Sequence, residues 1–294
     1  MKKKIIGFIL VLLVVISIPF LPLPNIDNVL PAQSSNISSE ESINTNMRVH
    51  YIDVGQGDSI LLTVNNKTML IDAGPRSDED KLLNYLSSQN ITKLDYVIAT
   101  HPHEDHIGNM DEVIKKYDIG TFYAPKKTAT SKTYESMIQA LLDKGKQITV
   151  IKEGTSSIDL GENTRVTVYS PTKDEYEDVN NFSPIIKIEY GENSFMFTGD
   201  AEDVVEKEVL SKNASLKSDV LKLGHHGSKS STTEGFYKAV DPSIAVISCG
   251  RDNKYNHPSK ETKDLLRKYR PKTFRTDLDG TIVLESNGKE IFRH

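Results

Sequence analysis

The sequence predicts an α/β domain in which two β-sheets pack face to face between two outer layers of helices. From Met47 onward, short apolar segments typical of strands alternate with segments of helical periodicity. The strand segments fall into two sets, and two such sheets with interspersed helices are best buried as helix–sheet–sheet–helix layers. The composition, with 37% hydrophobic and 26% charged residues, is ordinary for a globular protein, and 294 residues suffice for one large domain or two small ones.

The first set of strands begins with a meander. Strands are expected at 48–54, 59–64 and 67–71, because Gly55-Gln-Gly57 and the asparagines at 65–66 supply turn residues between the apolar runs. The same reasoning predicts further strands at 95–99 and 121–123 and helices at 78–88, 109–117 and 130–144.

The second set runs from residue 147 toward the C-terminus. The single cysteine, Cys249, ends an apolar strand, so we expect a buried thiol and no disulfide framework. The expected strands are 147–151, 165–169, 184–190, 194–197, 220–223, 244–248, 272–275, 281–285 and 290–292, and the expected helices are 201–211, 232–240 and 259–269.

The most informative segment, 100–108, reads Thr-His-Pro-His-Glu-Asp-His-Ile-Gly. Imidazole and carboxylate are the usual nitrogen and oxygen ligands of zinc and other first-row metals. Because Pro102 disfavours a helix, we expect a loop that turns its first two histidines one way and the later aspartate and histidine the other, toward two adjacent metal ions. The four candidate ligands are His101, His103, Asp105 and His106.

This segment resembles the His-x-His-x-Asp-His signature of the metallo-β-lactamase superfamily. Further blocks narrow the resemblance to the hydrolase domain of ComEC-type DNA-uptake proteins and their free-standing, exported relatives. The resemblance covers about residues 47–294 and implies a single αββα sandwich with the site along one edge. The blocks are His50-Tyr-Ile-Asp-Val-Gly-Gln-Gly-Asp-Ser59, Leu70-Ile-Asp-Ala-Gly74, Phe197-Thr-Gly-Asp200, Leu221-Lys-Leu-Gly-His-His-Gly-Ser228 and Tyr255-Asn-His-Pro258.

The resemblance also implies the remaining metal ligands. An aspartate at the position of Asp200 bridges the two metals in the family. One of the two adjacent histidines at 225 and 226 is expected to be a ligand of the second metal, and we favour His225. His226 would then orient a ligand or bind substrate. A histidine expected before the bridging aspartate is absent, and Asn181 is the expected substitute, with Asn180 as the alternative. An amide oxygen in place of imidazole shifts the preference from zinc toward manganese or magnesium.

Other residues are expected to act around the metals. His257 resembles a late histidine of the family, and we expect it to contact the scissile phosphate or donate a proton to the leaving group. We expect Asp72 to support the ligand loop, and Asp58 to cap a turn or reach the site. Further candidates for substrate contact are His226, Ser228, Lys229 and Lys254, together with Lys126, Lys127, Lys132 and Arg251.

These features predict a metal-dependent hydrolase whose chemistry depends on Asp105, Asp200 and His257. Two divalent ions, zinc or manganese with magnesium as a further option, would hold a bridging hydroxide. The resemblance implies a phosphodiester substrate such as DNA, because in the ComEC family this domain is thought to degrade the strand that is not imported. The alternatives are a cell-envelope phosphoesterase and a β-lactamase or lactonase; a monomeric enzyme is favoured over a binding module without catalysis.

The N-terminus predicts export. Three lysines precede an apolar run, as in a bacterial secretory signal, so the catalytic domain is expected outside the cytoplasm, either secreted or on the outer face of the cytoplasmic membrane. The net charge of −5 argues against a protein that coats nucleic acid generally. The expected divisions are a signal peptide or membrane anchor at 1–24, a flexible linker at 25–46 and the hydrolase domain at 47–294.

Overall fold

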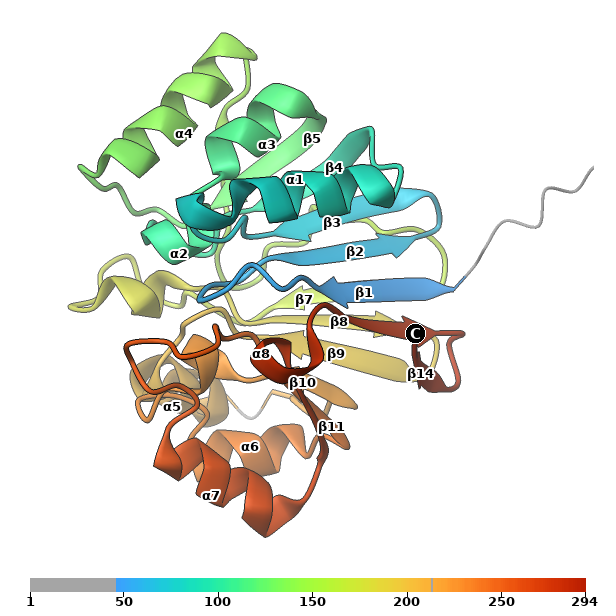
Figure 1. Cartoon of the computed structure of the whole chain (residues 1–294). Coiled ribbons are helices and arrows are strands. Elements are labelled where there is room, and N and C mark those ends of the chain that lie inside the picture. Colours follow the sequence, from blue (N-terminus) through green and yellow to red (C-terminus); the bar gives the residue numbers. More distant parts are fainter. Residues whose placement is uncertain (1–45, 213) are drawn as a thin grey trace, which may run out of the picture. The chain divides into compact units, whose positions relative to one another are not determined.

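The computed structural model describes residues 46–212 and 214–294. This part of the chain is an αββα sandwich, as the sequence predicted, with two sheets packed face to face (Figure 1). The expected signal or anchor and, except for its last residue, the expected linker lie outside the described residues. Within the described ranges, no helix combines the length and the apolar character needed to span a bilayer.

The first sheet contains eight strands. They are β1 (Met47–Tyr51), β2 (Ile60–Val64), β3 (Lys67–Ile71), β4 (Lys93–Ile98), β5 (Asp118–Ala124), β6 (Ile148–Val150), β13 (Ile282–Ser286) and β14 (Ile291–Arg293). Their order is β14-β13-β1-β2-β3-β4-β5-β6. The meander β1–β3 is antiparallel, and β3 to β6 run parallel, because helices connect them.

The second sheet contains six strands. They are β7 (Thr164–Val168), β8 (Ile186–Tyr190), β9 (Asn193–Phe197), β10 (Val220–Lys222), β11 (Ile244–Ile247) and β12 (Lys272–Arg275). Their order is β12-β11-β10-β9-β8-β7, with β7 to β9 antiparallel and β9 to β12 parallel. Both sheets therefore combine an antiparallel meander with a run of parallel strands.

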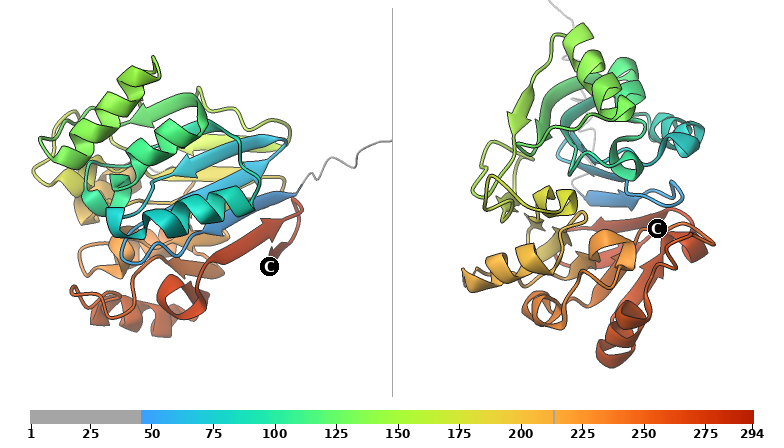
Figure 2. Two further views of the ribbon diagram at one scale, coloured as in Figure 1. Left: turned by 45° about the horizontal axis from the view of Figure 1, so that its top comes forward. Right: turned by 90° about the vertical axis from the view of Figure 1, so that its left-hand side faces the viewer.

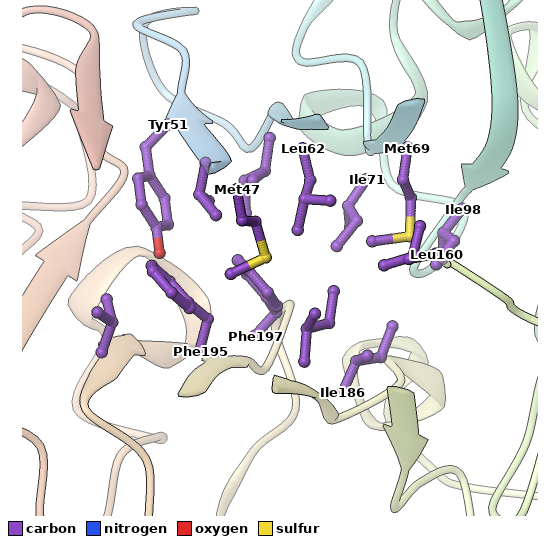
Figure 3. Packing of buried hydrophobic residues seen from close by; sticks show 14 of the residues in the cluster. Met47, Tyr51, Leu62, Met69, Ile71, Ile98, Leu160, Ile186, Phe195 and Phe197 are labelled. Atoms are coloured by element: carbon purple, nitrogen blue, oxygen red, sulfur yellow. The ribbon is translucent and has the colours of Figure 1, made fainter. Parts of the chain in front are cut away.

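The main apolar core lies between the two sheets. Tyr51 and Leu62 from the first sheet face Ile186, Phe195 and Phe197 from the second (Figure 3). Burial of these side chains holds the sheets together, at about 1.5–3 kcal/mol for each large apolar side chain. Because side chains alternate across a strand, the opposite face of each sheet is free to bury apolar residues against helices.

Helices cover both outer faces (Figures 1 and 2). Helices α1 (Glu79–Ser88), α3 (Met110–Lys116) and α4 (Lys132–Asp143) pack on the first sheet, and α5 (Asp203–Ser211), α6 (Glu234–Val240) and α7 (Lys260–Tyr269) pack on the second. The shorter elements are α2 (Glu104–Ile107), α8 (Thr276–Asp279) and the 3₁₀ turns η1 (Arg76–Asp78), η2 (Val179–Phe182) and η3 (Gly224–Gly227).

Two expectations need correction. Strands β6, β13 and β14 were placed with the second set, but all three belong to the first sheet, where β6 pairs with β5, β13 pairs with β1 and β14 pairs with β13. The segment 100–108 is not a loop throughout, because a short helix, α2, begins at Glu104. Pro102 lies before that helix, where its missing N–H costs no helical hydrogen bond, and His103 is extended at the N-cap.

The parallel strands bring polar residues to one edge of the sandwich. In sheets of this kind, ligands bind beyond the carboxyl ends of the strands. The residues that follow the strand ends are Asp72 after β3, Thr100 and His101 after β4, Asp200 after β9, His225 and His226 after β10, and Ser248 after β11.

Candidate metal centre

The strand ends of both sheets surround a cavity of about 760 Å³. Imidazole and carboxylate groups make up half of its lining, which also includes the exposed side chains of Tyr255 and Lys254. Of the predicted site residues, those that line it are His103, Asp105, Asp200, His225, His226 and His257, besides Lys254.

The Asp200 carboxylate lies among four imidazoles. Its Oδ2 atom is 3.2 Å from His106 Nε2, 3.5 Å from His226 Nε2, 3.7 Å from His225 Nε2 and 4.0 Å from His101 Nε2. Burial by itself would raise the pKa of Asp200, but His106 and His226 outweigh it and hold that pKa well below its ordinary value. The side chain is therefore a buried carboxylate that several donors share.

The first group of donors contains His101 and His103. His101 Nε2 lies 2.9 Å from His103 Nδ1, and the two rings meet edge to face. The other nitrogen of His101, Nδ1, is within hydrogen-bonding distance of Thr100 Oγ1 (3.1 Å) and Ser183 Oγ (3.3 Å). Burial lowers the pKa of His101 well below its ordinary value, which keeps the imidazole neutral, as a metal ligand must be.

The second group contains Asp105, His106 and His226, whose donor atoms lie within 4.8 Å of one another. His106 Nδ1 donates to Asp72 Oδ2 at 2.7 Å, so Nε2 points away from that carboxylate toward Asp200. Asp72 also accepts the Thr100 backbone N–H at 2.8 Å. A carboxylate that fixes the second nitrogen of a ligating histidine is a common support in metal sites.

The structure reverses the preference between the two adjacent histidines. Both have left-handed backbones, with φ of 47° at His225 and 54° at His226, so their side chains diverge. His226 is buried, donates Nδ1–H to Ser248 O at 3.0 Å and holds Nε2 3.4 Å from Asp105 Oδ2. His225 is 23% exposed and contacts Glu202 through Nδ1 at 3.3 Å. His226 therefore belongs to the second donor group, whereas His225, the expected ligand, lies at the cavity wall.

The structure also favours Asn180 over Asn181 in place of the absent histidine. The Oδ1 atom of Asn181 accepts the backbone N–H of Glu202 at 3.0 Å, so it is already engaged. Asn180 lines the cavity, and its buried Oδ1 has no hydrogen-bond partner among the described residues. Asn180, the alternative to Asn181 in the sequence analysis, is therefore the residue whose amide oxygen is available to a metal.

A buried ion pair supports His226 from behind. Lys222 is fully buried, pairs with the Asp58 carboxylate and also donates to Gly199 O at 3.3 Å. Burial would raise the pKa of Asp58, but Lys222, His226 and His106 together outweigh it and lower that pKa to about 2. Asp58 Oδ1 lies 3.4 Å from His226 Nδ1. Lys222 was not singled out from the sequence, although a lysine inside an apolar strand was a usable signal.

The remaining candidates divide between the cavity and other surfaces. His257 lines the cavity, its buried Nδ1 has no partner among the described residues, and burial lowers its pKa to about 4. Ser228 contacts Ser230, which in turn contacts His225. Lys229 was expected near the substrate, but it lines a separate depression. The other candidate cations, Lys126, Lys127, Lys132 and Arg251, do not line the catalytic cavity either.

The donor set fits divalent metal ions. Buried polar atoms without partners are costly, and the described cavity region contains several. A cation would satisfy them, and the mixture of imidazole nitrogen with carboxylate and amide oxygen suits zinc or manganese. The unpartnered atoms are His106 Nε2, His226 Nε2, Asp200 Oδ1 and Asn180 Oδ1.

Comparisons with known proteins agree with this geometry. Residues 52–251 match the family described as the metallo-beta-lactamase superfamily. The chain is 34% identical over 252 residues to ComE operon protein 3 of Bacillus subtilis. This match covers 80% of this chain and 32% of the length of that protein. It is also 29% identical over 240 residues to Recombination protein 2 of Haemophilus influenzae, and this match covers 80% of this chain and 28% of the length of that protein. The chain thus spans about a third of the length of these curated relatives.

A solved structure shows the same fold. The metallo-beta-lactamase fold protein YhfI from Bacillus subtilis superposes with a TM-score of 0.53 at 16% identity, covering 82% of this chain and all of that chain. At this identity the likeness shows the fold alone.

Removing the Lys222 ammonium should destabilise the protein through Asp58. Lys222→Met leaves a buried carboxylate unpaired, and we expect the free energy of unfolding in urea to fall by about 3–5 kcal/mol. The double variant Asp58→Asn, Lys222→Met removes both charges and should regain more than half of that loss. Lys217→Met, which breaks an exposed ion pair with Asp241, is the control and should change stability by less than about 1 kcal/mol. Equal losses in Lys222→Met and Lys217→Met would contradict the role of the buried pair.

Metal binding should release protons. Burial would lower the pKa of His226, but Asp200 and Asp58 outweigh it and raise that pKa to about 9 in the metal-free protein. The imidazole is therefore protonated at pH 7 and must lose a proton to bind a metal. Affinity for Mn²⁺ should rise about tenfold per pH unit for each released proton between pH 7 and 9. Titration calorimetry in two buffers of different ionisation heat measures the release; an affinity independent of pH would contradict it.

Proposed function

Because the chain belongs to the metallo-beta-lactamase superfamily, we propose that it is a metal-dependent phosphodiesterase that acts on DNA. The observation that carries the proposal is the Asp200 carboxylate, which lies within 4.0 Å of imidazoles from both donor groups at the wall of an open cavity. Hydrolases with two metals use such a shared carboxylate to hold both ions beside the bond that breaks. The N-terminal sequence adds to the proposal that this activity is exported.

The protein would hold the ions at the edge of the sandwich, beyond the strand ends of both sheets. When bound, divalent ions lower the pKa of water and neutralise the negative charge that builds up on the phosphate. One ion would take His101 and Asp200, together with His103 beside His101 and the Asn180 amide of the cavity lining. The other would take Asp105, His106, His226 and Asp200.

The protein's own groups position the reactants. Hydrolysis forms a bond from water oxygen to phosphorus and breaks an ester P–O bond, so a proton must leave the water and another must reach the departing oxygen. Asp105 is 29% exposed and faces the cavity, where its carboxylate can accept a hydrogen bond from the water. Hydrogen bonds from Nδ1 to Asp72 and to the Ser248 carbonyl hold the imidazoles of His106 and His226 in place.

His257 is suited to contact the substrate rather than a metal. With a pKa lowered to about 4, its imidazole is neutral at pH 7 and donates one N–H hydrogen bond. A phosphate anion bound beside it raises that pKa, since a nearby negative charge favours the protonated ring. His257 can then pass a proton to the departing oxygen.

Two observations support a phosphodiester over a lactam. The chain is similar to segments of Recombination protein 2 and of Competence protein ComA of Neisseria gonorrhoeae (27% identical over 232 residues), whose names refer to processes in which DNA is handled. Lys254 lies at the mouth of the cavity, where an ammonium can bind a neighbouring phosphate. The segment match supports this substrate for the domain alone, because the relatives are about three times as long.

A substrate panel tests the proposal. The full chain should cleave DNA and bis(p-nitrophenyl) phosphate when Mn²⁺ is added, and should leave the β-lactam nitrocefin intact. The pair Asp105→Asn, His106→Ala should reduce cleavage to background, because it removes two donors of one group. Lys217 is exposed and pairs with Asp241, and neither residue lines the cavity. The Lys217→Met variant should therefore cleave DNA as the unaltered chain does.

Other outcomes would redirect the proposal. Rapid nitrocefin hydrolysis without any phosphodiester cleavage would overturn it. Cleavage of a glycerol-phosphate polymer with DNA left intact would keep the phosphodiesterase chemistry and reject DNA as the substrate.

A further inference from the structure

An exposed aromatic ring stands at the catalytic cavity. Large hydrophobic side chains that are exposed are few and scattered over the described residues, and Tyr255, at 52% exposure, is the one among them that lines this cavity. An aromatic ring exposed to water lacks the favourable free energy that burial gives, and a planar group stacked on the ring would provide it. The others are Leu142, Val150, Val204, Leu278 and Phe292.

The ring is fixed next to the candidate catalytic groups. Tyr255 is stacked on His257, with ring centroids 5.6 Å apart and planes 24° apart. The His257 ring in turn lies 5.7 Å from the His225 ring. The side chain of Asn253 donates to the carbonyls of Gly250 and His257 and accepts the His257 backbone N–H at 2.9 Å, which ties the loop together. The Tyr255 ring therefore has a set position relative to the cavity.

Two polar groups accompany the ring. The Lys254 ammonium lies 5.0 Å from the ring centroid, and this exposed, flexible side chain can swing to a phosphate. Gln56 lines the same cavity; its Oε1 accepts the Gly250 N–H, and its buried Nε2 has no hydrogen-bond partner among the described residues. A ligand that satisfies this region therefore offers a planar face, an anion and a hydrogen-bond acceptor.

We propose that Tyr255, Lys254 and Gln56 form a subsite for a nucleotide next to the scissile phosphate. Tyr255 stacks on the nucleobase, Lys254 binds the flanking phosphate, and Gln56 donates to an acceptor on the base or the backbone. This inference rests on the proposed function and narrows it, because it assigns the enzyme to nucleic acids rather than to phosphate polymers without bases. Stacking on an aromatic ring tolerates any base, so the subsite predicts little sequence preference.

The cavity has the size for such a ligand. At about 760 Å³ it lies within the range of pockets that enclose whole small-molecule ligands, and a phosphodiester group alone would leave most of it empty. A neighbouring depression of about 340 Å³, lined by Arg251 and Asp277 among others, shares Gln56 and Asn253 with the cavity. A strand with nucleotides on both sides of the cleaved bond can therefore follow the surface away from the metal centre.

Binding of matched oligonucleotides tests the subsite. The full chain, with Ca²⁺ in place of a catalytic metal, is titrated against a fluorescent single-stranded oligonucleotide and against the same strand with abasic nucleotides. Tyr255→Leu should weaken binding of the base-bearing strand by about 5- to 150-fold, as expected for the loss of one stacked base. Tyr255→Phe keeps the ring and should stay within about twofold. The abasic strand should bind the unaltered chain more weakly, and Tyr255→Leu should not weaken it further.

The controls separate stacking from a structural role. A structural effect of Tyr255→Leu would reduce binding of both strands alike, and that result would overturn the subsite. It would also be overturned if the unaltered chain bound both strands equally, or if it bound a glycerol-phosphate polymer with the same dependence on Tyr255. Cleavage with Mn²⁺ is measured separately. Base-dependent binding without cleavage would therefore reject the proposed activity and keep the subsite. Cleavage without base-dependent binding would keep the proposed activity and reject the subsite.

Discussion

The constraint on which the site depends is the Asp200 carboxylate, buried within 4.0 Å of four imidazoles. So many titratable groups are stable in one buried place only when charges and hydrogen bonds are matched. Asp72 fixes His106, and Asp58, itself paired with the buried Lys222, lies against His226. Each imidazole thus has one nitrogen held by the protein and one turned toward the shared carboxylate.

The fold supplies this arrangement because the site is built from both sheets. The first sheet contributes the ends of β3 and β4, and the second contributes the ends of β9 and β10, so the apolar core between the sheets sets the distances between donors. Left-handed backbones at Asp72, His225 and His226 cost about 1–3 kcal/mol each. The packing of the rest of the sandwich offsets that cost. A strained backbone at three site residues fits a centre that is organised before its ligand arrives.

The sequence predicted the fold class and nearly every long element, because apolar periodicity reports directly on buried faces. It could not assign β6, β13 and β14 to the right sheet, since periodicity does not identify the neighbouring strand. The choices between His225 and His226 and between Asn180 and Asn181 depended on local backbone turns that no spacing reveals. Lys222 and Asp58 lie 164 residues apart in sequence, so their pairing emerges only from the packed sheets. The ligand segment itself was found because its chemistry is local.

The central claim is that one carboxylate serves two metal ions, and anomalous scattering from crystals grown with Mn²⁺ tests it most directly. We predict two anomalous peaks about 3.5–4 Å apart, both in contact with Asp200. One should lie beside His101, His103 and Asn180, and the other beside Asp105, His106 and His226. A single peak away from Asp200, or two peaks that contact separate carboxylates, would contradict the account.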